Sequence, residues 1–205
     1  ISMVCTCFDK YSFGYNAFFK IIRNDKLHFS KIKSLSDIKR TALILDVGGG
    51  TGLIAEFFVD DCKKITVLDP SEKMLSKIKS CKIENVLGDA QKIPFENETF
   101  DLVYCVDASH HFTNGQKKED YNFVIDKSIK EMLRVLKKNG SLIVAEFDID
   151  RIWGKLGVFL ENKPMKFGSK FFSRQELKSL FEKQNCKVEI FDLDYLCYVA
   201  KISKK

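Results

Sequence analysis

Residues 42–53 read ALILDVGGGTGL, and the rest of the chain is organised around this stretch. An apolar run ends in the carboxylate of Asp46, and glycines follow at positions 48, 49, 50 and 52. A short apolar run bounded by glycine predicts a buried parallel strand. The glycines allow positive φ and remove side chains where a ligand contacts the backbone. A helix predicted over residues 53–58 would begin at these glycines, which makes the stretch a nucleotide-type pocket.

The carboxylate of Asp46 argues against a pyrophosphate ligand, because a negative charge two residues before the first glycine would repel an anion at the helix N-terminus. The spacing of Gly48, Gly50 and Gly52 is G-x-G-x-G, whereas the dinucleotide fingerprint needs its third glycine where this chain has Leu53. The turn therefore favours a ligand with positive charge, such as an ammonium or a sulfonium. The alternative is a glycine-rich turn that serves close packing only.

The length and composition indicate one globular domain. The chain has 205 residues, of which 45% are hydrophobic and 30% are charged, enough for a sizeable core. No stretch approaches the roughly 18 uninterrupted apolar residues of a membrane span, and no secretory signal is visible. We expect a cytoplasmic protein without a membrane span, whose natural start is Met3 after an added Ile1-Ser2.

The cysteines indicate a reducing compartment rather than a metal centre. Their number is odd, and no pair has the C-x-x-C spacing of a zinc or redox site. The one metal hint is a C-x-C pair near the N-terminus, and we predict no metal ligand. The seven cysteines are Cys5, Cys7, Cys62, Cys81, Cys105, Cys186 and Cys197.

The net charge of +6 comes from lysines that are spread along the chain and alternate with acids. A nucleic-acid surface more often clusters arginines with aromatic residues. We interpret the lysines as solvated helix faces and expect no nucleic-acid partner.

Four more apolar runs, at 64–69, 83–87, 100–106 and 141–147, alternate with helical patterns. This alternation predicts an α/β fold with an open, doubly wound parallel sheet. An acid stands at or just after the end of these strands, and ligands bind at the carboxyl edge of such sheets. The acids expected to converge on one cleft are Asp46, Asp69, Asp89 and Asp107.

The positions of these acids suggest an adenosine. Asp69 lies 19 residues after Gly50 and is placed to accept both ribose hydroxyls. Asp89 can accept from an adenine amino group, and Ala90 leaves room for the ring. Pro70 introduces a helix predicted to run to residue 78.

The remaining segments are predicted from their patterns. Aromatic residues recur at helical spacing over 8–23, either as core or as a lid over the pocket, and 24–40 carries one more short helix. A long helix is expected over 118–137, with Asn139-Gly140 as its stop. Residues 149–172 show no clean period and are predicted to be a loop-rich insertion over the cleft.

The C-terminal part is predicted to hold one helix and two strands. Ser173 and Glu176 have the spacing of a capping box, so a helix should follow and run to about residue 184. Two short runs, 187–192 and 196–202, are joined by a tight turn and should pair antiparallel.

Four segments in order resemble the class I S-adenosylmethionine-dependent methyltransferases, within their small-molecule branch that includes ubiquinone and menaquinone biosynthesis enzymes. They read LDVGGGTG, VLDPSEKML, GDAQKIPFENETFDLVYC and EMLRVLKKNGSLIVAEF. The resemblance covers 41–147, and the last 30 residues by pattern. It departs from the family at Lys138-Asn139-Gly140, where the family usually has Pro-Gly-Gly.

The resemblance implies a Rossmann-like seven-stranded sheet that ends in an antiparallel strand pair, and S-adenosylmethionine as cofactor. It divides a single domain, 1–205, into a helical lid (1–40), a cofactor-binding core (41–148), a substrate-side insertion (149–172) and a C-terminal helix and strand pair (173–205). The cofactor site would be formed by Asp46, Gly48, Gly49, Gly50, Asp69, Pro70, Asp89, Ala90 and Asp107.

The implied reaction is methyl transfer to a small-molecule acceptor, which the aromatic segments suggest is apolar or aromatic. His110 and His111 lie just past the fourth strand as candidate general bases, and His111 is favoured because the family often has a histidine before an aromatic there. His28 has no such context. The oligomeric state is not predicted.

Three alternatives stay open. Asp46 and Leu53 disfavour a nicotinamide-dependent oxidoreductase. A non-catalytic protein could bind the cofactor on this fold without turning it over. A nucleic-acid methyltransferase of the amino-methylating kind often has an Asn/Asp-Pro-Pro-aromatic box after the fourth strand, where this chain reads Asp107-Ala108-Ser109-His110.

Overall fold

A computed structural model of the chain describes residues 24–36, 38–165 and 169–205. The predicted aromatic helix over 8–23, with its interpretation as a lid, lies outside these residues. Among them, no helix is long and apolar enough to cross a bilayer.

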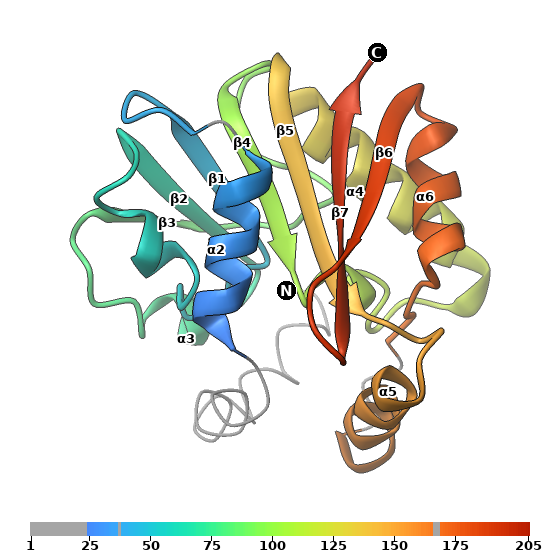
Figure 1. Cartoon of the computed structure of the whole chain (residues 1–205). Helices are drawn as coiled ribbons and strands as arrows, with labels where there is room; N and C mark the ends of the chain where they lie inside the picture. The colour runs from blue at the N-terminus through green and yellow to red at the C-terminus, as the bar shows by residue number, and fades with distance from the viewer. Residues whose placement is uncertain (1–23, 37, 166–168) are drawn as a thin grey trace.

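Seven strands form one sheet in the order β3-β2-β1-β4-β5-β7-β6 (Figure 1). Strands β1 to β5 all run parallel to one another. Strand β7 runs antiparallel to its two neighbours, β5 and β6. The predicted doubly wound fold and its C-terminal antiparallel pair are therefore confirmed. The strands are β1 (Leu43–Val47), β2 (Lys64–Asp69), β3 (Ile83–Leu87), β4 (Phe100–Val106), β5 (Leu136–Phe147), β6 (Cys186–Asp192) and β7 (Cys197–Lys204).

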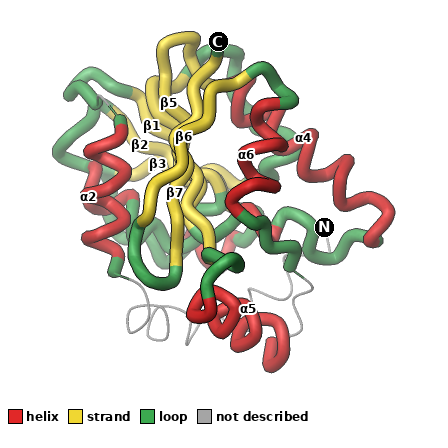
Figure 2. Tube along the Cα trace, turned by 45° about the vertical axis from the view of Figure 1, so that its right-hand side comes forward, coloured by secondary structure: helices red, strands yellow, loops and turns green. Residues whose placement is uncertain are grey.

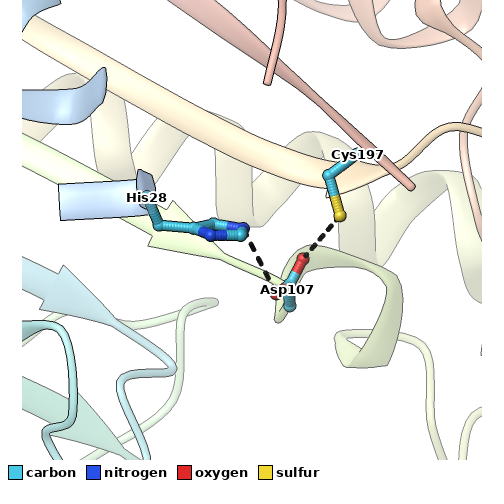
Figure 3. A group of neighbouring side chains, drawn as sticks. All are labelled: His28, Asp107 and Cys197. Carbon is cyan, nitrogen blue, oxygen red and sulfur yellow. Dashed lines mark hydrogen bonds and ion pairs between the residues drawn. The ribbon is translucent and has the colours of Figure 1, made fainter. Parts of the chain in front are cut away.

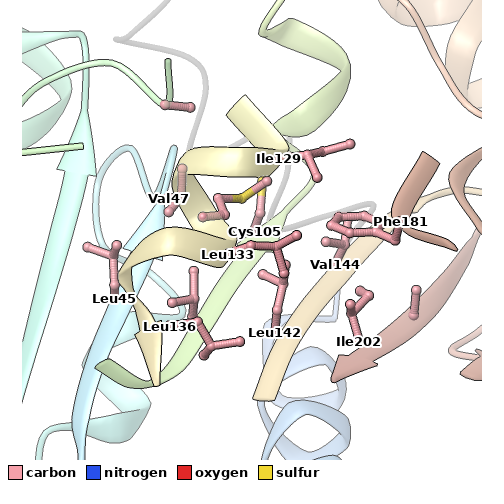
Figure 4. Close-up of a cluster of buried hydrophobic side chains, with 14 of the residues drawn as sticks. Leu45, Val47, Cys105, Ile129, Leu133, Leu136, Leu142, Val144, Phe181 and Ile202 are labelled. Carbon is pink, nitrogen blue, oxygen red and sulfur yellow. The ribbon is translucent and has the colours of Figure 1, made fainter. Parts of the chain in front are cut away.

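Helices cover both faces of the sheet, with α2 on one side and α4 and α6 on the other (Figure 2). Strand residues alternate between the two faces, so Leu45 and Val47 join the core under α4 (Tyr121–Val135) and α6 (Arg174–Glu182) (Figure 4). Ile44 joins the core on the opposite face, with Ile32 of α2 (Asp25–Leu35). The helix α2 is the short helix predicted within 24–40.

Two predicted helices are much shorter than expected. The segment after the glycine turn forms only a 3-10 helix, η1 (Ala55–Phe58), and the segment after Pro70 forms α3 (Glu72–Leu75). Phe57 stacks on Phe29 of α2 and Phe58 contacts the same ring edge to face, so α2 covers this part of the sheet in place of a longer crossover helix.

The predicted stop of the long helix is also wrong. Two 3-10 turns, η2 (Ser109–His111) and η3 (Lys118–Asp120), lead into α4, which ends at Val135. Residues 136–140 then belong to β5, with an irregular register against β4. Gly140 is required there because a Cβ at this position would lie 2.8 Å from the Asp101 carbonyl oxygen. Asn139-Gly140 therefore shapes a strand rather than ending a helix.

The region after β5 contains a helix where a loop-rich insertion was expected. This helix, α5 (Ile152–Met165), lies apart from the other helices beyond the edge of the sheet (Figure 2). Gly154 is needed at its start because a Cβ would collide with the Asp148 carbonyl oxygen. The next helix, α6, begins with the predicted capping box of Ser173 and Glu176.

Candidate functional site

An open cavity of about 690 Å³ lies at the carboxyl edge of β1, β2, β3 and β4. Eight of the predicted site residues line it: Gly48, Gly50, Asp69, Pro70, Asp89, Ala90, Asp107 and His111. The topology explains the gathering, because parallel strands bring their carboxyl ends to one edge.

Asp46 and Gly49 line an adjoining hollow of about 360 Å³. This hollow shares Gly48 and Gly50 with the larger cavity. The expectation that four strand-end aspartates share one cleft therefore needs a correction: three share the large cavity, and Asp46 faces the neighbouring one. The reason is strand alternation, which directs Asp46 to the face opposite Leu45 and Val47.

The glycine turn is held in one conformation by its surroundings. Gly48, Gly50 and Gly52 have φ values of 73°, 56° and 73°. The N–H of Gly48 donates to the Leu68 carbonyl at 2.7 Å, which fastens the turn to β2. A Cβ at Gly48 would lie 2.7 Å from that of Ala108, so the turn has no room for a side chain there.

Asp69 links the glycine turn to the next loop. One carboxylate oxygen accepts from the Gly50 N–H at 2.9 Å, and the other accepts from the Ser71 N–H at 2.8 Å. The residue is only 8% exposed. A carboxylate oxygen has two lone pairs, so it can accept from a ligand hydroxyl as well as from a backbone N–H. Asp89 is also anchored, through the Gln91 N–H at 2.7 Å.

Asp46 is buried, and its carboxylate packs against Gly49, where any Cβ would collide with it. Burial first, and then the negative charge of Asp46, raise the pKa of Tyr104 well above its usual value of 10. Tyr104 is therefore a neutral phenol beside a carboxylate, and it adds no negative charge to the hollow.

The two adjacent histidines are in different environments. His111 lines the large cavity, and its Nδ1 contacts the Ser169 hydroxyl at 2.9 Å and the Asn114 amide nitrogen at 3.1 Å. Burial, followed by the neighbouring His110, holds the pKa of His111 well below its usual 6.5. His111 is therefore a neutral imidazole at pH 7.

His110 is buried beneath the cavity and does not line it. Its Nδ1 lies 2.5 Å from a carboxylate oxygen of Glu146, and its ring stacks on Phe171 at 4.3 Å. Glu146 also accepts from the N–H of Ser109 at 2.9 Å and from the Ser109 hydroxyl. The Glu146 carboxylate thus holds the loop that presents His111, a role that the sequence pattern did not reveal.

The expectation that His28 has no site context is wrong. His28 is fully buried in the first turns of α2, and its Nε2 lies 3.9 Å from a carboxylate oxygen of Asp107. No sequence spacing pointed to this contact, because 79 positions separate the two residues along the chain.

Several cavity residues were not predicted. Leu68, Met74, Ala108 and Phe112 supply apolar wall around the strand-end carboxylates. Leu68 precedes Asp69 and Ala108 follows Asp107, so their position at strand ends could have predicted that they line the cavity. Met74 lies within the helix predicted after Pro70, where the sequence pattern gives no indication of a cavity.

A family model described as a methyltransferase domain matches residues 45–144, from the middle of β1 into β5. This stretch, about half of the chain, is similar to a methyltransferase domain. The match includes both hollows, the glycine turn and the two histidines.

Curated proteins are also similar to this chain. The ubiquinone/menaquinone biosynthesis C-methyltransferase UbiE of Escherichia fergusonii is 34% identical over 123 residues, which make up 55% of this chain and 45% of that protein. The UbiE of Escherichia coli K12 matches to the same extent. The chain thus spans about half the length of the curated relatives it matches.

Solved structures share the fold. An S-adenosylmethionine-dependent methyltransferase of Thermotoga maritima superposes with a TM-score of 0.77 at 20% identity, covering 97% of this chain and 99% of that one. The cyclase SpnF superposes with a TM-score of 0.66 at 16% identity, covering 88% of this chain and 81% of that one. One fold thus carries different reactions, so the reaction has to be argued from the site.

Proposed function

We propose that this chain transfers the methyl group of S-adenosylmethionine to a small-molecule acceptor. The observation that carries the proposal is the cavity in which the glycine turn meets three strand-end carboxylates. A carboxylate-rich edge suits a ligand with a sulfonium and an ammonium group, because opposite charges attract strongly in a partly buried site. The match to a methyltransferase domain supports the same reaction.

The chain's residues would hold the cofactor along this edge. Asp69 would accept hydrogen bonds from the ribose hydroxyls. Asp89 would accept a hydrogen bond from the adenine amino group, and Ala90 would leave room for the ring. Gly48 and Gly50 let the backbone approach the cofactor, and Asp46 and Gly49 hold its methionine part in the adjoining hollow. Pro70 and Asp107 complete the walls.

The reaction is an in-line displacement. A new bond forms between the acceptor atom and the methyl carbon, the carbon–sulfur bond breaks, and its electron pair stays on sulfur as neutral S-adenosylhomocysteine. The donor is already activated, so the protein mainly aligns the two reactants and excludes water. A proton then leaves the acceptor.

We assign the acceptance of that proton to His111. The imidazole lines the cavity and is neutral at pH 7. A base with a depressed pKa is ready to accept without first losing a proton. His110, the second candidate, is buried against Glu146, and we propose that it supports the loop instead.

The acceptor is proposed to be apolar or aromatic. Leu68, Met74 and Phe112 form an apolar wall beside the cofactor edge, and the UbiE relatives are C-methyltransferases of ubiquinone and menaquinone biosynthesis. A nucleic acid fits less well, because the lysines are spread rather than clustered. The cysteine pattern favours a reducing compartment, so we propose that the protein acts in the cytoplasm.

Titration calorimetry with S-adenosylmethionine, with NAD⁺ as the control ligand, tests cofactor choice. We expect binding of the first only. Incubation with a panel of quinols and phenols, followed by mass spectrometry, then tests methyl transfer. Binding without S-adenosylhomocysteine formation on any acceptor would support a non-catalytic protein, and binding of NAD⁺ alone would contradict the site assignment.

Replacing His111 by glutamine is expected to lower kcat by about 100-fold, the lower end for loss of a general base. The affinity for S-adenosylhomocysteine should change little, because the variant keeps every carboxylate. Single-turnover rates and calorimetry on the same preparation measure both quantities. An unchanged kcat would remove His111 from the reaction.

The stability of the protein is expected to fall as the pH drops through 6.5. His111 has a depressed pKa in the folded state, so below its unfolded pKa of about 6.5 the unfolded chain binds a proton that the folded chain does not. Thermal unfolding at pH 7.5 and 5.5 should show a smaller loss of Tm for His111→Gln than for the unsubstituted chain. Equal losses would contradict the depressed pKa.

A further inference from the structure

We propose that His28, Asp107 and Cys197 bind a divalent transition-metal ion of the zinc class. The three residues come from distant parts of the chain and are all buried. Figure 3 shows their side chains pointing toward one another. The site shares Asp107 with the cavity described above, but its test measures metal binding and does not depend on methyl transfer.

The topology explains why the three residues meet. His28 lies near the start of α2, and Asp107 directly follows β4. Cys197 begins β7, which runs antiparallel, so its first residue lies beside Phe147 at the end of β5. The carboxyl edge of the sheet therefore receives a thiol that a fully parallel sheet would place at the opposite edge.

The distances suit a metal ion. His28 Nε2 lies 3.9 Å from Asp107 Oδ2, and Cys197 Sγ lies 4.0 Å from Asp107 Oδ1. One ligand atom from each residue can be chosen so that all lie within 4.8 Å of one another. Bond lengths of a tetrahedral zinc site put ligand atoms roughly 3.3–3.8 Å apart, so closure needs shifts of a few tenths of an ångström to about one ångström.

The imidazole of His28 supplies an independent indication of a ligand. Its Nδ1 lies 3.0 Å from the Asn24 carbonyl oxygen, which places the ring hydrogen on Nδ1. Nε2 then carries a lone pair, is fully buried, and has no hydrogen-bond partner among the residues that the structure describes. A histidine ligand whose other nitrogen donates to a backbone carbonyl is the usual arrangement in metal sites.

The charge and type of the donors select the ion. One imidazole nitrogen, one carboxylate oxygen and one thiolate sulfur suit Zn²⁺ or a similar transition metal, whereas Mg²⁺ and Ca²⁺ prefer oxygen ligands throughout. On binding, the Cys197 thiol releases its proton to solvent. The carboxylate and the thiolate then balance the two positive charges of the ion, which removes the cost of burying them alone.

The site also borders the large cavity, because Asp107 lines both. Three protein ligands leave a fourth tetrahedral position for water or for an oxygen of a bound molecule. A metal here would therefore form part of the cavity wall, on the side where β4 ends.

The test uses the full chain with Cys5→Ser and Cys7→Ser, so that the N-terminal C-x-C pair cannot bind the probe. The metal-free protein is titrated with Co²⁺ and followed by absorption spectroscopy. We expect one equivalent to bind, with the visible bands of tetrahedral cobalt and a near-ultraviolet thiolate-to-cobalt charge-transfer band. Addition of Zn²⁺ should displace the cobalt and abolish both.

Two variants and one control assign the ligands. Cys197→Ser should abolish the charge-transfer band, and His28→Gln should weaken cobalt binding by at least 10-fold. Cys186→Ser is the matched control, because Cys186 is also buried but lies outside the cluster. Circular dichroism confirms that each variant is folded. Absence of the charge-transfer band in the starting protein, or its persistence in Cys197→Ser, overturns the proposal.

Discussion

Replacing Asp69 by alanine is expected to weaken S-adenosylmethionine binding by about 10² to 10⁴-fold. The carboxylate would accept two ribose hydroxyls, and each hydrogen bond to a charged group contributes about 1.5–3 kcal/mol. The substitution also leaves the N–H groups of Gly50 and Ser71 without their acceptor, which loosens the glycine turn. Titration calorimetry measures the affinity directly.

Two further variants separate these effects. Asp69→Asn keeps one oxygen acceptor and the shape of the residue, so its affinity should lie between those of the alanine variant and the unsubstituted chain. Asp60→Ala removes an exposed carboxylate that pairs with Lys82 at the surface, and it should leave binding unchanged. Normal affinity in Asp69→Ala would mean that the ribose is not held at the end of β2.

Replacing Gly48 by alanine is expected to destabilise the folded chain by about 2–5 kcal/mol. A non-glycine residue at φ +73° costs about 1–2 kcal/mol, and forcing a methyl group into a packed site costs about 1–3 kcal/mol. The new Cβ would lie 2.7 Å from that of Ala108, which directly precedes the turn of the two histidines. In a chain of this size Tm should fall by roughly 4–20 °C, and cofactor affinity should fall with it.

Gly115→Ala is the matched control for Gly48→Ala. Gly115 has nearly the same φ, 75°, but it lies exposed in the loop before α4. The Gly115→Ala variant should therefore lose only the stability that backbone strain costs, about 1–2 kcal/mol, and it should keep its affinity for the cofactor. Equal losses of Tm in the two variants would show that strain, rather than the contact with Ala108, governs Gly48.

The parallel strands were predictable because each is a short apolar run with a polar boundary. The bounds of β3 and β4 match the predicted runs to the residue, since Gly88 and Asp107 directly follow them and end the apolar pattern. The helices were less predictable. The segment 53–58 has a helical pattern, yet its own Phe57 and Phe58 are already covered by α2, so a short 3-10 helix forms there.

The cofactor edge was predictable for the same reason as the strands. Asp69, Asp89 and Asp107 follow consecutive strands, and parallel pairing alone brings such ends together. The loop histidines were identified as a pair, but their different roles were not, because the partner of His110 is Glu146, 36 positions further along the chain.

The sequence by itself determined the parallel sheet, the glycine turn and the row of carboxylates, because each depends on residues close together in the chain and on strand order. Only the tertiary structure decided that His111, and not His110, lines the cavity, and that His28 and Cys197 meet at Asp107. The first depends on the contact of His110 with Glu146, and the second on where α2 packs and on the reversed direction of β7. Local spacing carries no information about these contacts, since contacts between distant segments are set by the packing of whole elements on the sheet.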